Sequence, residues 1–156
     1  MPLPRGINLD DEMKSKTLSA WLALVLGPLG GHRFYLFGWS DTLGWLLPVP
    51  TALGVYGFER VKQFGLDDVM SWWLLPILGF TIAATSLNAI VFGLMKPEDW
   101  NARFNPELPA DHPAGRTRWA TIGAIVLSLM IGTVGLLSGL AYSIQRYFEA
   151  TIEVIQ

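Results

Sequence analysis

The side chains best placed for chemistry in this sequence are His32 and Arg33, which follow two glycines inside an apolar stretch. Arginine carries five donors in a planar fork that suits carboxylates and phosphates, and an ionisable group near a membrane interior is a functional hypothesis by default. We predict a turn and recognition segment at Gly30, Gly31, His32, Arg33, Phe34 and Tyr35.

Three roles are open to Arg33, and we favour the first. It can stabilise the turn, by reaching lipid phosphates or by donating to the exposed carbonyls of Leu26, Gly27 and Leu29. It can bind an acidic headgroup or the carboxylate of a partner. Catalysis is the third role, and no nucleophile or second acid stands at a recognisable spacing from it.

The remaining sequence offers no catalytic or metal-binding pattern. His32, His112 and Asp111 lack the ligand number and spacing of a zinc site. The chain has no cysteine, which excludes a thiolate metal site and a cysteine nucleophile. Phosphate-loop and serine-elbow motifs are missing as well. We therefore predict no catalytic residues, no enzyme activity, no metal and no other cofactor.

Composition indicates a membrane protein. Of the 156 residues, 51% are hydrophobic and only 15% are charged, whereas soluble domains carry about 25% charged residues. The apolar residues gather in long windows with few charges, and the acidic residues near the start argue against a cleaved signal peptide. With a net charge of −2, nucleic acid is not an expected partner. Membrane lipids are the expected partners, and binding to other membrane proteins or to a second copy of the chain is left open.

The apolar windows predict an all-helical, multi-pass fold. A membrane helix needs about 20 residues to cross a hydrocarbon core of about 30 Å, so the first window is short unless Lys14 and Lys16 extend it by snorkelling. The last helix, continuing to Phe148, should be the longest. The four transmembrane helices are predicted at residues 17–29, 40–57, 72–95 and 118–142.

These helices divide the chain into six segments. A polar tail comes first, then a transmembrane hairpin, an interfacial linker, a third helix, a proline-rich polar loop, and a fourth helix with a polar extension. Their expected ranges are 1–16, 17–57, 58–71, 72–95, 96–117 and 118–156.

Small and polar residues inside the helices predict close packing. Thr81, Thr85 and Asn88 share one helix face, which indicates either interhelical hydrogen bonds or a substrate path. A second group consists of small residues at helical spacing, and it serves packing within the monomer, our preferred reading, or dimerisation. That group comprises Ser128, Gly132, Gly135 and Gly139. Gly27, four residues before Gly31, either allows close helix approach as well or only makes the turn.

Four crossings place both termini on the same side of the membrane. Six Lys and Arg residues then lie on the side of the termini and five on the other. The pair Lys14 and Lys16 stands close to the first helix, where the positive-inside rule weights charge most. We therefore predict that both termini are cytoplasmic.

Residues 14–58 resemble the TM2 domain family, in which two membrane helices are joined by a loop with a G-x-H-R-F-Y-L-G type core. The matching stretches are K-S-K at Lys14 and L-G-P-L-G-G-H-R-F-Y-L-F-G from Leu26 to Gly38. Phe37 is an insertion before Gly38, and Glu59 is a poor match for the acid that often ends the second helix. The resemblance to bacterial members implies a location in the cytoplasmic membrane, and it implies little about activity.

The function predicted from these features is that of a non-catalytic scaffold or accessory subunit, acting through helix–helix and lipid-headgroup contacts. The alternative is a small transporter or channel component that uses the polar face of the third helix. The predicted spans contain no acid or lysine at mid-depth, which ion transporters usually carry, so the first function is preferred.

Overall fold

The computed structural model describes residues 13–155, and within that range the chain is helical with no strand, which confirms the predicted all-helical class. Most of the predicted polar tail, residues 1–12, lies outside the described residues. The helices are α2 Lys16–Val25, α3 Gly31–Phe37, α4 Thr42–Leu46, α5 Pro48–Phe64, α6 Val69–Leu94, α7 Pro97–Phe104 and α8 Trp119–Ile155, with short 3₁₀ turns η1 Gly27–Leu29 and η2 Pro113–Gly115.

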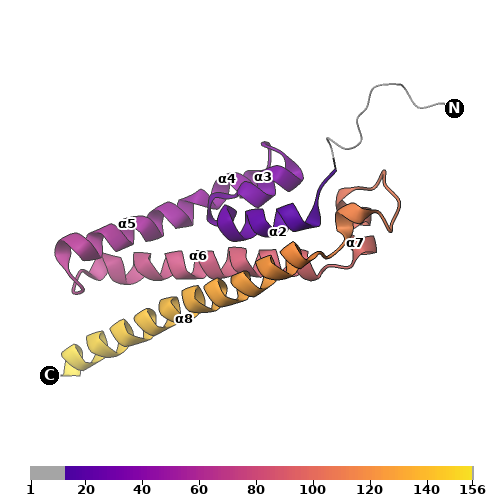
Figure 1. Cartoon of the computed structure of the whole chain (residues 1–156). Coiled ribbons are helices and arrows are strands. Elements are labelled where there is room, and N and C mark those ends of the chain that lie inside the picture. The colour runs from indigo at the N-terminus through magenta and orange to yellow at the C-terminus, as the bar shows by residue number, and fades with distance from the viewer. Residues whose placement is uncertain (1–12, 156) are drawn as a thin grey trace.

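Helix α6 is the centre of the molecule, and α2, α5 and α8 all pack on it (Figure 1). Helix α5 lies along the first part of α6, where Gly54 faces Leu78 and Gly57 faces Leu74. Helix α2 packs beside the second part of α6, between Thr85 and Met95. Helices α2 and α5 therefore lie along different stretches of α6. A Cβ at either glycine of α5 would collide with α6, so these residues allow the close approach.

The small residues of α8 face α6. Gly132 lies against Ser86, Gly135 against the Gly79 backbone, and Gly139 against the Pro76 carbonyl. Ser128 is fully buried within the same helix. In the structure this stripe therefore packs within the monomer.

Two helical segments are long and apolar enough to cross a membrane. They are α6, with a mean hydropathy of 1.9 over its most apolar window, and Pro113–Ile152, with 2.2, which contains most of α8. As predicted, α8 is the longest helix, with 37 residues. The four predicted transmembrane helices are not confirmed, because α2 has only 10 residues and the region 40–57 is divided into α4 and α5 near Pro48.

The first predicted span is too short because Gly27 and Pro28 end α2 early. Helix α2 begins beside Met95, at the end of α6, and Gly27 lies against Thr85. Thr85 stands ten residues before Met95, a distance of about 15 Å along a helix. The turn therefore lies beside the middle of α6 rather than at its far end.

Helix α3 returns from this turn to the end where α2 began. Gly30 adopts a left-handed conformation, with φ of 79°, and starts α3 in the new direction. At the far end of α3, the Tyr35 hydroxyl accepts a hydrogen bond from the Ser15 amide, 2.8 Å away, and the Phe37 ring packs against Phe104. The structure therefore does not confirm the prediction that this hairpin, at residues 17–57, crosses the membrane twice, because its first half turns back beside the middle of α6.

The helix at the second predicted span ends later than expected. Asp41 caps α4, and α5 continues to Phe64, well into the predicted linker 58–71. Gly65, with φ of 85°, ends α5, and Asp68 caps α6. The first half of the predicted linker is thus the end of α5.

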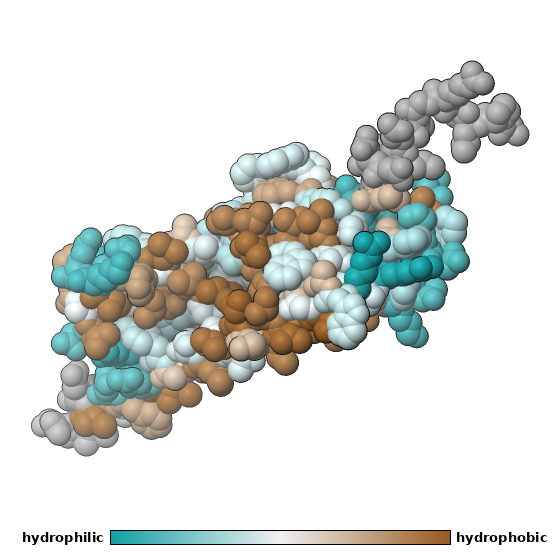
Figure 2. All heavy atoms as spheres, in the orientation of Figure 1, coloured by the Kyte–Doolittle hydropathy of each residue, from teal (hydrophilic) through white to brown (hydrophobic). Residues whose placement is uncertain are grey.

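The described N-terminal segment and the end of α8 lie at opposite ends of the molecule (Figure 1). The prediction that both termini share a side of the membrane depended on four crossings, which the structure does not confirm. Figure 2 shows apolar residues over the middle of the visible face and hydrophilic residues gathered towards both ends. This distribution suits a protein whose long axis crosses a bilayer.

The loop predicted at 96–117 is folded. Pro97 stands at the first turn of α7, Glu98 and Asp99 follow it, and this order favours a helix start. Trp100, in the middle of α7, is fully buried. The region therefore forms a cap over one end of the helices.

Candidate functional site

The polar residues of the hairpin and the cap meet at the end of α6. The centre of this site is Lys16, which is 0% exposed. Its Nζ donates to the Met95 carbonyl and to the Thr117 hydroxyl, both at 2.8 Å. The expected snorkelling of Lys16 towards lipid is wrong, because its first-turn position on α2 points into the protein. The ammonium instead binds the C-cap carbonyl of α6, where a cation is favourable.

The cap holds the backbone in front of α2. The Asn105 side-chain amide binds both backbone groups of Lys14, accepting from its N–H at 2.8 Å and donating to its carbonyl at 3.1 Å. Trp100 Nε1 donates to the same carbonyl at 2.8 Å. The Tyr35 hydroxyl, which accepts from Ser15, donates to the Met13 carbonyl at 3.3 Å. The segment 13–16 is therefore fixed between α3 and α7.

The residues of the cap were missed by reasoning from the sequence. Asn101 is fully buried and donates to the Ala110 and His112 carbonyls at 2.9 and 3.0 Å, which closes the loop over α7. Asn101 and Asn105 are one helical turn apart, 3.3 Å between Oδ1 and Nδ2. The proline and acidic residues at the start of α7 were the available signal.

Arg33 forms a bidentate ion pair with Asp41. Arg33 Nε and Nη2 lie 2.6 and 2.9 Å from the two carboxylate oxygens, and Asp41 also accepts from the Gly44 amide at 2.7 Å as the N-cap of α4. The hydrogen bond from Arg33 lowers the pKa of Asp41, and the same bond raises the pKa of Arg33. The pair fixes α3 against the start of α4.

The prediction that Arg33 binds the last carbonyls of the first helix is wrong. The Leu26 carbonyl accepts from the amides of Leu29 and Gly31, at 3.1 and 2.8 Å, and the Gly27 carbonyl accepts from Gly30 at 2.9 Å. Backbone amides satisfy these acceptors because the 3₁₀ turn brings them close, so the turn does not require the guanidinium.

His32 is 1% exposed and packs against Phe92, with ring centres 5.9 Å apart. Within the described part of the chain, neither ring nitrogen has a hydrogen-bond partner. A general base must reach its proton directly or through one water, and this ring reaches no described polar atom. The geometry supports a packing role for His32 in α3.

An exposed aromatic cluster, formed by Phe34, Trp39 and Trp45, lies beside the Arg33 pair. Phe34 stacks on Trp39 at 5.0 Å and meets the edge of Trp45 at 5.1 Å. Trp45 Nε1 donates to the Trp39 carbonyl at 2.8 Å, which holds the two tryptophans together. Trp39 is 73% exposed, so this cluster is the part of the motif that faces outward.

Of the polar face predicted on the third helix, which is α6, Thr81 and Thr85 are buried and Asn88 is half-buried. The Thr81 and Thr85 hydroxyls donate to the carbonyls of Ile77 and Ile82 in their own helix, at 2.7 and 3.2 Å. Thr85 is also covered by Gly27. Asn88, on the same face, makes no hydrogen bond within the described residues.

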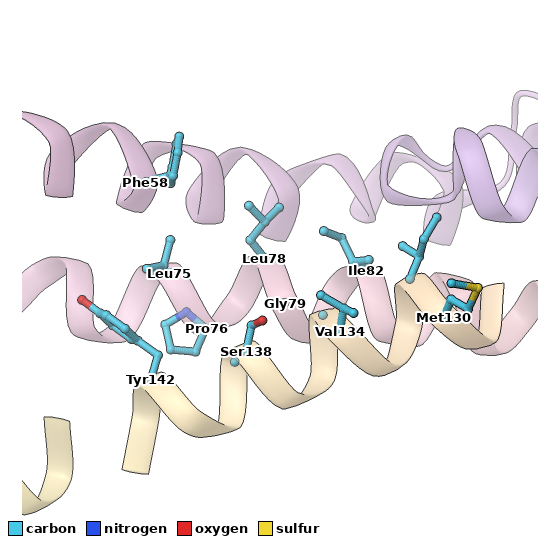
Figure 3. Close-up of a pocket in the computed structure, with 13 residues that line it drawn as sticks. Phe58, Leu75, Pro76, Leu78, Gly79, Ile82, Met130, Val134, Ser138 and Tyr142 are labelled. Carbon is cyan, nitrogen blue, oxygen red and sulfur yellow. The ribbon is translucent and has the colours of Figure 1, made fainter. Parts of the chain in front are cut away.

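An apolar groove of about 630 Å³ lies between α5, α6 and α8 (Figure 3). Phe58 stands on its α5 side, Leu78 and Ile82 on α6, and Val134 and Tyr142 on α8. No charged residue lines this groove in the described structure, and its hydroxyl groups come from Ser138 and Tyr142. The lining suits apolar chains.

Within residues 13–155, no three His, Asp or Glu side chains are grouped to hold a metal ion. Comparison of the chain with family models, with curated proteins and with solved structures finds no match. The TM2 resemblance therefore remains a prediction from the sequence motif.

Substitution of the two lysines tests the site. Lys16→Met should lower the free energy of unfolding by about 1–3 kcal/mol, because it leaves the partly buried Met95 carbonyl without its donor. Lys14→Met is the matched control, because among the described residues the Lys14 ammonium makes no hydrogen bond and lies 5.1 Å from the Tyr35 ring. Tryptophan fluorescence during heating in detergent measures both, and equal stability of the two variants would contradict a capping role for Lys16.

Proposed function

We propose that this chain is an integral membrane protein with three crossings, α4–α5, α6 and α8, and that α2–α3 is a re-entrant hairpin. The segment Thr42–Phe64 would extend about 34 Å as a helix, enough for one crossing. A turn at membrane depth must satisfy its backbone within the protein. The Pro28 carbonyl meets this need, because it accepts from the Thr51 hydroxyl at 2.6 Å.

The orientation follows from this arrangement. Lys and Arg side chains within residues 13–155 number ten, and seven of them lie at the end that holds the N-terminal segment and the cap. The positive-inside rule then makes this end cytoplasmic and the end of α8 external. The seven are Lys14, Lys16, Arg33, Lys96, Arg103, Arg116 and Arg118, against Arg60, Lys62 and Arg146 at the opposite end.

The function best supported is that of a non-catalytic scaffold or accessory subunit of TM2 type in a bacterial cytoplasmic membrane. The observation that carries this proposal is the internal use of the motif's polar groups: Arg33 binds Asp41, Tyr35 binds the N-terminal segment, and Lys16 caps α6. What remains exposed is the aromatic cluster, a surface suited to headgroups and to neighbouring proteins.

The transporter alternative gains no support from α6. The hydroxyls of Thr81 and Thr85 are bonded to their own helix, and Gly27 fills the space beside Thr85. A transport path would need these groups to face water or a substrate.

Cysteine labelling tests the orientation. The sequence has no cysteine, so only the introduced thiol can react. Single cysteines at Gly6 and Ala110 should resist an impermeant maleimide in intact cells, whereas cysteines at Asp67 and Thr151 should react. Permeabilised cells provide the control for reactivity. If the cysteine at Ala110 reacts while that at Gly6 resists, the four-crossing topology is supported and the three-crossing topology is excluded.

Photocrosslinking in native membranes tests the scaffold function. A photoreactive phenylalanine at Trp39 should give one discrete protein adduct, identifiable by mass spectrometry, because this side chain projects from the aromatic cluster. The same group at Trp73, 76% exposed at the other end of the molecule, is the matched control. Adducts to lipid alone from Trp39 would contradict a protein partner at this surface.

A further inference from the structure

Arg146, on α8, is a buried cation with unused donors. The residue is 6% exposed, and its Nε has no partner among the described residues. Nη1 lies 2.6 Å from a Glu149 oxygen and 4.0 Å from Asp67. The guanidinium is held between the rings of Trp72 and Tyr142, at 5.5 and 5.4 Å. A buried donor without an acceptor is costly, so an anionic oxygen is favoured beside it.

Arg146 lines the end of an apolar groove between α6 and α8, with a volume of about 470 Å³. Trp72, Trp73 and Tyr147 line the same end, and Ile77 and Phe80 continue the groove along α6. Phe80 also lines a second apolar hollow, which reaches Ala83 and beyond. This surface is distinct from the groove of Figure 3, which Arg146 does not line.

The dimensions match one leaflet of a bilayer. Trp73 and Ala83 are ten residues apart on α6, about 15 Å, which is half of a hydrocarbon core of about 30 Å. Tryptophan and tyrosine at the Arg146 end are typical of the headgroup level. An acyl chain can therefore lie in the groove while its headgroup lies at Arg146.

The charges at this end select the headgroup. Arg146 offers donors to a phosphate, and the carboxylates of Asp67 and Glu149 stand beside it. The Asp67 side chain is fully exposed. That of Glu149 is 43% exposed and already accepts from Arg146 and from Gln145 Nε2, the latter at 2.9 Å, so Asp67 is the more open of the two to a ligand cation. One cation flanked by two carboxylates complements a phosphate joined to a primary ammonium better than it complements a purely anionic headgroup.

We propose that this groove is a binding site for phosphatidylethanolamine. The phosphate binds the free donors of Arg146, the ammonium binds Asp67 and Glu149, and one acyl chain lies along Ile77 and Phe80. The site rests on the membrane orientation proposed above and specifies one lipid that the protein holds.

Lipid binding to the full chain, purified from membranes in mild detergent and delipidated, tests this site. Phosphatidylethanolamine should raise the midpoint of thermal unfolding and give a one-to-one complex by native mass spectrometry, ahead of phosphatidylcholine and phosphatidylglycerol. Arg146→Gln should weaken binding about tenfold or more, the loss expected for a charge-assisted hydrogen bond. Asp67→Asn should remove the preference for ethanolamine over choline and keep a bound phospholipid.

Matched controls separate this site from general lipid contact. Lys62→Gln removes an exposed cation at the same end, with a side chain 54% exposed, and should not change binding. Ser143→Phe fills the proposed groove, whereas Ser138→Phe fills the groove of Figure 3, so only the first should displace the lipid.

Two results would overturn the lipid site. One is equal binding of the three lipids, and the other is unchanged binding by Arg146→Gln, which keeps a polar side chain of similar length and remains decisive if Ser143→Phe fails to fold. Failure of the membrane proposal itself is a different result, because the wild-type chain would then be recovered from the soluble fraction without detergent.

Discussion

The bond between the Lys16 ammonium and the Met95 carbonyl determines where the chain begins its path beside α6. It ties the first residue of α2 to the last turn of a helix 79 positions away in the sequence. Helix α2 has 10 residues, so it ends beside the middle of α6, where Gly27 lies against Thr85. The chain must then return or continue, and the 3₁₀ turn at Gly27–Leu29 sends it back.

The return of the hairpin has consequences for the whole molecule. Helices α4 and α5 then lead away from the hairpin, and α5 packs along the first part of α6. The N-terminal segment and the end of α8 therefore lie at opposite ends of the molecule (Figure 1). The turn can lie at depth because its own amides and the Thr51 hydroxyl satisfy its carbonyls. Arg33 is therefore available to Asp41, and it joins α3 to α4 in a pair whose side chains are 24% and 14% exposed.

Sequence reasoning predicted the features that depend on local composition. The length and apolarity of α6 and α8 are local features, and the structure has both. The burial of Lys16 was not predictable in the same way, because a lysine before an apolar run also suits snorkelling. Its acceptors, Met95 and Thr117, become neighbours only when the cap has folded. Arg33 had two kinds of acceptor within eight residues, the carbonyls at the end of the first helix and the Asp41 carboxylate. The direction of α3 decides that it binds Asp41.

The depth of a spin label at Leu29 tests most directly whether the turn after α2 lies at the middle of the bilayer, as proposed. Leu29 is 53% exposed and Trp39 is 73% exposed, so both positions accept a label without disturbing the core. In liposomes, collision with oxygen and with a water-soluble nickel chelate should place Leu29 near the bilayer centre and Trp39 at the headgroups. A headgroup depth for both labels would mean that the first helix crosses the membrane, and it would contradict the re-entrant hairpin.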